Sequence, residues 1–158
     1  MNAATTTELL RRQPFFKGLS EQQIQALGAL AREVRYERDT VLFKEGEESG
    51  SFYLIISGMV ALEIAPLGDA LRLDTLSAGD EFGFSSVIGQ KTVFQARVLK
   101  DLHALALDAT MLRTLCATDT KFGYEFMCRL MNLVSDRLQA TRLRLMDTYW
   151  PVAQRAGA

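Results

Sequence analysis

The chain has 158 residues, 48% of them hydrophobic and 23% charged, which is the composition of one globular domain with a proper core. Its formal net charge of −1 excludes the global positive field that a free-standing nucleic-acid-binding protein uses. Cys116 and Cys128 form no paired motif, so we interpret them as thiols in a reducing compartment and not as a disulfide framework or a zinc site.

The N-terminal segment, residues 1–13, contains no apolar signal core, and no run elsewhere approaches the length of a membrane span. We therefore expect a cytoplasmic protein without a membrane partner, and we expect this segment, which begins with small and polar residues, to be flexible. Ser20 and Gln23 then form a capping box, and apolar residues follow at helical spacing. This pattern predicts a helix over residues 20–32.

From residue 34 to residue 107 the pattern changes to short β-prone runs separated by turn residues such as glycine and aspartate. Seven segments are predicted to be extended: 34–36, 40–43, 51–57, 59–65, 70–76, 93–99 and 102–107. Short strands at such regular spacing are typical of a β-sandwich or a barrel-like roll, and they argue against a parallel α/β sheet.

Two helices are predicted after the strands. Asp108 is a candidate N-cap for a short helix whose apolar residues include Leu112. A long helix is expected over residues 120–147, with one apolar stripe that can lie back on the strands. That stripe consists of Phe122, Phe126, Leu130 and Leu133.

The long helix carries a second apolar stripe, whose steps of four and three residues are the spacing of a coiled-coil seam. The candidate dimer-interface residues are Met127, Met131, Val134, Leu138, Thr141 and Leu145. A helix of this length spans roughly 40 Å and projects beyond so small a domain. We therefore expect a parallel homodimer, with packing of both stripes inside one subunit as the alternative.

Three segments with glycines at turns of the predicted strands form a set: residues 41–47, 52–58 and 79–83. Together with the order of helix, strands, short helix and long helix, this set resembles the cyclic-nucleotide-binding domain family, which includes the sensor domains of catabolite-activator and FNR-type regulators. The resemblance covers about residues 14–147 and leaves residues 148–158 as a tail. It implies an α+β fold, a jelly-roll-like double-stranded β-roll with an N-terminal helix, a short helix and a long C-terminal dimerisation helix.

The resembled family binds its ligand through a phosphate-binding cassette, which runs from a Phe-Gly-Glu motif through a short helix to an arginine at the start of a strand. In that family the short helix presents N–H groups to the cyclic phosphate, the arginine neutralises it, and the glutamate binds the ribose hydroxyl. In this chain Phe84 stands at the position of the glutamate and Thr92 at that of the arginine, while the neighbouring Lys91 offers only a point charge. Loss of two such anchors weakens nucleotide binding roughly 10²- to 10⁴-fold.

The resemblance assigns the candidate ligand-binding residues to the cassette and to the long helix over its mouth. They are Phe82, Gly83, Phe84, Ser85, Ser86, Lys91, Thr92, Val93, Thr141 and Arg142. Thr141 stands where a threonine of catabolite-activator-type regulators meets the base of the nucleotide across the dimer, and a polar residue that sets the register of the seam is the alternative. The candidate ligand is cyclic AMP, cyclic GMP or another small anion, and no cofactor is expected.

No set of residues indicates catalysis or metal binding. His103 is the single histidine, which argues against a metal site and against a triad with Ser85 or Ser86. The cassette also lacks the Gly-x-Ser-x-Gly motif of a nucleophile elbow, so we do not expect an enzyme.

The basic residues near the end of the long helix are interpreted as a solvated face that complements the helix dipole, in preference to a nucleic-acid contact. They are Arg137, Arg142 and Arg144. Only residues 148–158 follow the long helix, too few for the winged helix-turn-helix domain of the family's transcription factors, so no direct DNA binding is expected.

These features predict a stand-alone regulatory sensor that binds a cyclic nucleotide weakly, or another small anion, and signals through its dimer helix. Ligand entry would reposition the long helix, which is the element with two available arrangements. The alternative is a ligand-free interaction module that keeps only the fold, with a protein partner on the roll or on the tail around Trp150.

Overall fold

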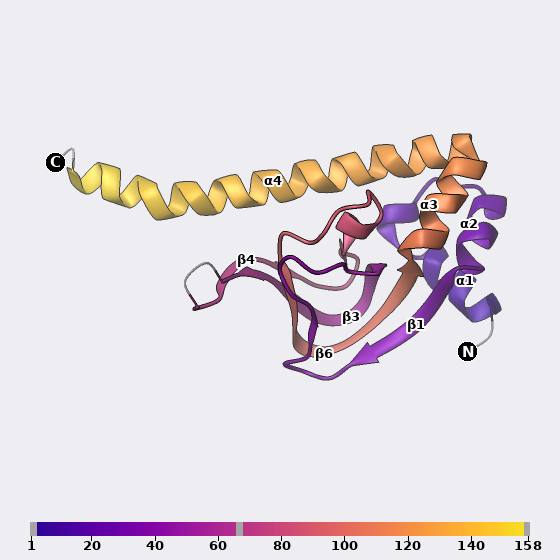
Figure 1. The fold of residues 1–158 in the computed structure, drawn as a ribbon, viewed down its shortest axis with the longest axis horizontal. Helices are drawn as coiled ribbons and strands as arrows, with labels where there is room; N and C mark the ends of the chain where they lie inside the picture. Colours follow the sequence, from indigo (N-terminus) through magenta and orange to yellow (C-terminus); the bar gives the residue numbers. More distant parts are fainter. Residues whose placement is uncertain (1–2, 66–67, 157–158) are drawn as a thin grey trace.

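The computed structural model describes residues 3–65 and 68–156 as a roll of antiparallel strands with helices around it (Figure 1). The strands are β1 (Ala31–Tyr36), β2 (Val41–Phe43), β3 (Ser51–Ile64), β4 (Leu71–Leu76), β5 (Glu81–Phe82) and β6 (Gln95–Asp108). Neighbouring strands follow the order β1-β6-β3-β4, while the short strands β2 and β5 pair with β6 and β3. Every pairing between these described strands is antiparallel, and the predicted α+β β-roll is confirmed.

β3 and β6 are each one long strand where the sequence predicted two short ones. Gly58 in β3 explains the prediction: its φ is +100°, and a Cβ atom there would lie 2.3 Å from the carbonyl oxygen of Asp101 on β6. The register of β3 against β6 shifts on both sides of this glycine, between Ile55 and Val60. The glycine therefore marks an irregularity inside a continuous strand pair, not a turn between two strands.

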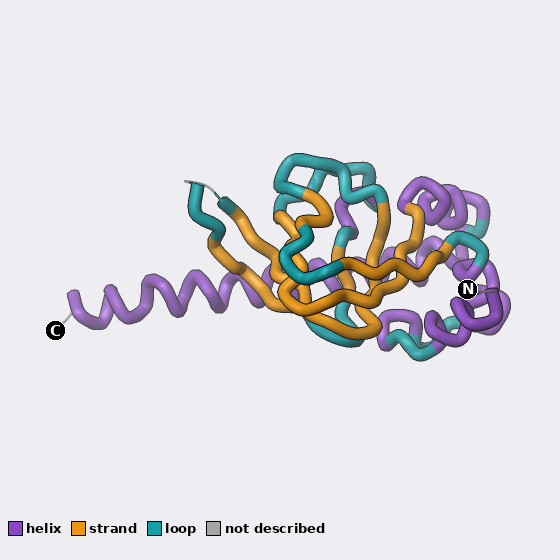
Figure 2. Tube along the Cα trace, turned by 90° about the horizontal axis from the view of Figure 1, so that it is seen from below, coloured by secondary structure: helices purple, strands orange, loops and turns teal. Residues whose placement is uncertain are grey.

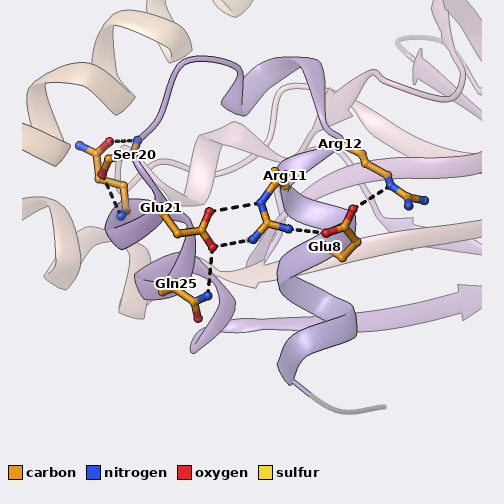
Figure 3. Close-up of polar contacts among 7 residues, drawn as sticks. Glu8, Arg11, Arg12, Ser20, Glu21 and Gln25 are labelled. Carbon is orange, nitrogen blue, oxygen red and sulfur yellow. Dashed lines mark hydrogen bonds and ion pairs between the residues drawn. The ribbon is translucent and has the colours of Figure 1, made fainter.

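The segment that was predicted to be flexible contains a helix, α1 (Ala3–Arg11). Leu10 is fully buried in the core, and Arg11 pairs with Glu8 on its own helix and with Glu21 on α2 (Glu21–Gly28) (Figure 3). Exposed ion pairs contribute roughly 0–1 kcal/mol each, whereas full burial of a leucine contributes about 1.5–3 kcal/mol. Tertiary burial of Leu10, which local composition does not reveal, packs this helix on the core.

α2 begins with the predicted capping box. The Ser20 hydroxyl accepts a hydrogen bond from the Gln23 backbone N–H at 3.2 Å, and the Gln23 side-chain oxygen accepts one from the Ser20 N–H at 2.8 Å (Figure 3). The helix ends at Gly28 and not at residue 32, because the chain enters β1 at Ala31. Between α1 and α2, the 3₁₀ helix η1 (Pro14–Phe16) packs its two aromatic rings against Phe126.

α3 (Ala109–Thr118) begins at the predicted N-cap, since the Asp108 carboxylate accepts a hydrogen bond from the Met111 N–H at 2.8 Å. α4 (Thr120–Ala156) buries its predicted inner stripe against the roll and projects far beyond the strands (Figure 1). Residues 148–156, predicted as a tail, continue this helix. The side chain of Trp150 lies outside the described residues. Among the described helices, none combines the length with the apolar character that crossing a membrane requires.

Two apolar clusters form the core. One lies among the helices and includes Leu10, Leu27 and Phe126, while the other fills the roll and includes Phe82. Figure 2 shows the corresponding arrangement, with the short helices gathered at one end of the strands and α4 running past the other. The aromatic rings around the candidate site pack on both clusters, so the site lies where the clusters meet, beside α4.

Candidate functional site

A small pocket lies between the strands of the roll and α4. It is lined by Phe43, Leu62, Phe82, Gly83, Phe84, Ser85, Thr92, Phe94 and Arg137. Gly83 separates β5 from the 3₁₀ helix η2 (Phe84–Ser86) and has a φ of +86°. A Cβ atom at Gly83 would lie 2.6 Å from the carbonyl oxygen of Ser51, so this turn over the pocket requires glycine.

The structure brings five predicted ligand-binding residues to this pocket: Phe82, Gly83, Phe84, Ser85 and Thr92. Ser86 lies behind it, where its hydroxyl oxygen accepts hydrogen bonds from the Ser49 hydroxyl at 2.7 Å and from the Gly50 N–H at 3.0 Å. Lys91 and Val93 are exposed and line no part of the pocket. The positive charge that the sequence suggested for the cassette therefore lies outside the pocket.

Thr92, at the position where the resembled family has an arginine, is buried and holds a neighbouring loop. Its hydroxyl lies 2.8 Å from the carbonyl oxygen of Lys44 and 2.9 Å from that of Glu47. Its backbone N–H also donates to the Glu47 carbonyl at 2.8 Å. Because the single hydroxyl proton is engaged with these carbonyls, Thr92 does not offer it to an anion.

Arg137 is the charged residue that the sequence analysis failed to place in the pocket. It comes from α4, is only 8% exposed, and donates to the Asp74 carboxylate on β4 at 3.3 Å and to the carbonyl oxygen of Glu81 on β5. Its Nε is buried without a hydrogen-bond partner. The interpretation as a solvated residue is wrong because Arg137 follows Leu130 and Leu133 at helical spacing, on the face of α4 that packs against the roll.

The charges around Arg137 are mostly negative. Burial raises the pKa of the Glu81 carboxyl to about 7; the guanidinium of Arg137 opposes this shift, and the carboxylates of Asp80 and Asp136 add to it. Burial likewise lowers the pKa of Arg137, against the effect of the same carboxylates and of Asp74. Since an arginine keeps its proton in proteins, the site holds one buried cation among acids, and Glu81 is the group that titrates near neutral pH.

The pocket is small. Its cavity has a volume of about 10 Å³, close to the minimum that holds one water molecule. Arg137 also lines a neighbouring open cleft of about 170 Å³, together with Asp74, Asp80 and Asp136. A ligand larger than water therefore enters the pocket only when lining side chains move.

The remaining predicted residues lie on α4 away from the pocket. Thr141 is half-buried and donates to the carbonyl oxygen of Arg137 at 3.0 Å, and Arg142 is exposed. In the predicted seam, Met131 and Leu138 are 68% and 69% exposed, Met127 and Leu145 are also exposed, and Val134 is half-buried. The seam thus forms an open apolar stripe on this chain, and its pairing with a second copy stays a prediction.

Comparison with protein families finds a match to the model of the cyclic nucleotide-binding domain over residues 33–119. Among curated proteins, the chain is 29% identical over 143 residues to a CRP-like cAMP-activated global transcriptional regulator of Mycobacterium tuberculosis, covering 89% of this chain and 62% of that regulator. It is 30% identical over 135 residues to glutaminase 1 of Bradyrhizobium diazoefficiens, covering 84% of this chain but 21% of the glutaminase. The chain therefore spans less than two thirds of the length of these relatives.

Solved structures with the same fold include two bacterial proteins. A putative cyclic nucleotide-binding protein of Geobacter metallireducens superposes with a TM-score of 0.75 at 24% identity, covering 84% of this chain and 97% of its own. A cyclic nucleotide-binding domain of Methylobacillus flagellatus superposes with a TM-score of 0.77 at 20% identity, covering 92% of this chain and 83% of its own. At these identities the likeness establishes the fold.

Proposed function

Because the chain belongs to the cyclic nucleotide-binding domain family, we propose that it is a regulatory sensor domain that binds a small anion beside Arg137 and relays occupancy through α4. The observation that carries this proposal is the position of Arg137, which lines the pocket, belongs to α4 and is bonded to β4 and β5. Among the described side chains, it is also the last buried residue along α4. A ligand that binds this guanidinium therefore changes the contacts of α4 at the point where the helix leaves the roll.

The cassette supports weak nucleotide binding at most. Phe84 brings an apolar ring where a ribose hydroxyl would need an acceptor, and the Thr92 hydroxyl is engaged with backbone carbonyls. The Mycobacterium tuberculosis relative is named as cAMP-activated, but at 29% identity this supports the sensor class and not the ligand. We therefore infer a millimolar affinity for cyclic AMP or cyclic GMP, roughly 10²- to 10⁴-fold weaker than a micromolar site.

The site supports recognition and not catalysis. His103 pairs with Glu33 at 2.9 Å between β6 and β1, and it lines no part of the pocket. Ser85 therefore has no histidine base beside it. The match to glutaminase 1 covers 21% of that enzyme, and its activity is not carried over to this chain.

We further propose that α4 pairs with a second copy in a parallel homodimer. The open stripe of Met127, Met131, Leu138 and Leu145 recurs at coiled-coil spacing along a helix that projects beyond the roll. A pair of such helices gives the domain an output, because a change at Arg137 alters the angle at which the two helices meet.

One observation favours a second function, that of an interaction module without a ligand. The cavity of about 10 Å³ holds no small molecule in the state described. In this alternative, a partner protein recognises the roll or the far end of α4.

Calorimetric titration with cyclic AMP and cyclic GMP, up to about 10 mM, tests the sensor proposal in wild-type protein and in Arg137→Gln. We expect weak saturable binding in the wild type and at least a tenfold loss in the variant, since a hydrogen bond to a charged group contributes about 1.5–3 kcal/mol. Arg12→Gln, which removes an exposed guanidinium beside α1, is the matched control and should bind as the wild type does. Nucleotide binding that is unaffected by Arg137→Gln would contradict the proposed site.

A further inference from the structure

The lining of the pocket is mostly apolar, and its polar side chains are Ser85, Thr92 and Arg137. Five of its side chains are aromatic or aliphatic: Phe43, Leu62, Phe82, Phe84 and Phe94. Arg137 is the one charged residue among the described lining residues, and it is buried. Pockets of this composition bind apolar molecules whose orientation is fixed by a small number of polar groups.

The same lining disfavours a sugar phosphate. A ribose and a cyclic phosphate bring several hydroxyl and phosphate oxygens, and burial of a polar group without a partner is unfavourable. Phe84 supplies no acceptor, and Thr92 directs its hydroxyl at the carbonyls of Lys44 and Glu47. A ligand with an apolar body and one charged group leaves no such oxygens unpaired.

The guanidinium of Arg137 is already bound to a carboxylate, but incompletely. Asp74 accepts from it at 3.3 Å, a long contact, and the Asp74 side chain is 33% exposed. The Nε–H of Arg137 is left without a partner. A guanidinium binds a carboxylate best through two parallel N–H groups, so it retains donor capacity that a second carboxylate can use.

We propose that the natural ligand of this pocket is an apolar carboxylate, a molecule with one carboxylate and an aromatic or branched aliphatic body about the size of a phenyl ring. Its carboxylate binds Arg137 in place of Asp74, and its body lies among the phenylalanines. This proposal rests on the proposed sensor function and names the ligand class of the same site. Asp74 is then an internal competitor for Arg137. When the ligand binds, the Asp74 side chain rotates away from Arg137 into the solvent.

The aromatic rings at the edge of the pocket set the size of the ligand. Phe84 and Phe94 are half-buried, and each packs on a different core cluster. Rotation of one of these rings outward would enlarge the small cavity. Because Asp74 lies on β4, its displacement also releases the bond between β4 and α4.

Titration calorimetry on the full chain tests the ligand class with four probes. Phenylacetate has the apolar body and the charge, phenylacetamide has the body alone, acetate has the charge alone, and cyclic AMP represents the family's ligand. We expect phenylacetate to saturate and to bind at least tenfold more tightly than each of the other three. If phenylacetamide binds as tightly as phenylacetate, the carboxylate is not recognised. If acetate binds as tightly as phenylacetate, the apolar body is not recognised.

Two outcomes separate this proposal from the sensor function. If cyclic AMP binds more tightly than phenylacetate, the ligand class is wrong and the sensor function stands. If none of the four probes binds at about 10 mM, both proposals fail and the ligand-free interaction module is favoured.

Asp74→Asn tests the competition without removing the arginine. It keeps the shape of the side chain and removes the competing charge, so phenylacetate should bind at least threefold more tightly than to the wild type. Asp147→Asn, which removes an exposed carboxylate farther along α4, is the control and should leave the affinity unchanged. Unchanged or weaker binding to Asp74→Asn would show that Asp74 does not compete.

Discussion

Arg137 combines three properties that are costly together in a folded protein. It is buried, it is charged, and its Nε–H has no partner. A buried donor without a partner costs roughly 1–3 kcal/mol. The carboxylate of Asp74 and the carbonyl of Glu81 offset part of the cost of burying the charge. The unused donor is available to a ligand that completes the hydrogen bonds of the guanidinium.

Glu81 makes the stability of the domain depend on pH. The pKa of its carboxyl rises from 4.5 to about 7 on folding, so the folded state binds this proton more tightly than the unfolded chain. The resulting stabilisation is fully present below about pH 4.5 and is lost as the pH rises through about 7. Because Glu81 is partly solvated, we expect the unfolding free energy to fall by about 1–2 kcal/mol between pH 5 and pH 8.

Urea denaturation across that range measures the effect, with Glu81→Gln as the test variant. The variant should show a flatter pH dependence than the wild type. Glu45→Gln, in the exposed loop after β2, should retain the wild-type dependence. Identical pH profiles for wild type and Glu81→Gln would contradict the assignment.

The sequence predicted part of the pocket and missed its charge. Phe82, Gly83 and Phe84 were predicted because the stretch resembles the Phe-Gly-Glu start of the family's phosphate-binding cassette. Arg137 was missed because it was grouped with Arg142 as a basic run, although its spacing from Leu130 and Leu133 places it on the inner face of α4. Lys91 and Val93 were predicted to bind the ligand but are exposed outside the pocket, because alignment with a motif does not show which way a side chain points.

At the scale of the elements, α4 has one buried face and one exposed face. The inner face, from Phe122 to Arg137, is buried against the roll, whereas the seam at Met131 and Leu138 is open. An open apolar stripe at coiled-coil spacing on a projecting helix is a surface that a second helix can cover. The helix therefore joins the pocket to the proposed dimer interface.

Leu138→Glu tests the dimer. A charge in the centre of the seam is unfavourable when it is buried between two helices, so we expect the variant to be a monomer at tens of micromolar by light scattering, where the wild type is a dimer. Gln139→Glu introduces the same charge at the adjacent exposed position outside the seam and should leave the dimer intact. A wild-type monomer, or a dimer in both variants, would contradict the interface.

Elements with strong local signals were predicted from the sequence, and elements set by tertiary contacts were not. The capping box at Ser20 and the N-cap at Asp108 are local chemistry and are present in the structure. α1 depends on burial of Leu10, and the continuity of β3 through Gly58 depends on its close approach to β6. Both are properties of the assembled fold, which periodicity along the chain does not contain.

For the whole molecule, Arg137 is the point where the roll, the pocket and the projecting helix meet. The described part of α4 beyond it is exposed or half-buried, so the helix leaves the roll at this residue. Its bonds to β4 and β5 hold α4 against the strands that form the pocket. The central claim is that these bonds couple the pocket to α4.

Amide hydrogen exchange of wild-type protein and Arg137→Gln measures this coupling without any ligand. Loss of one partner of a mostly buried ion pair is expected to cost about 1–3 kcal/mol locally. Exchange in β4 and in residues 133–147 should then rise by about tenfold or more, while the central pairing of β3 with β6 stays protected. Lys121→Gln, an exposed charge at the start of α4, should change neither region. Unchanged exchange in β4 and α4, or an equal rise throughout the protein, would contradict the account.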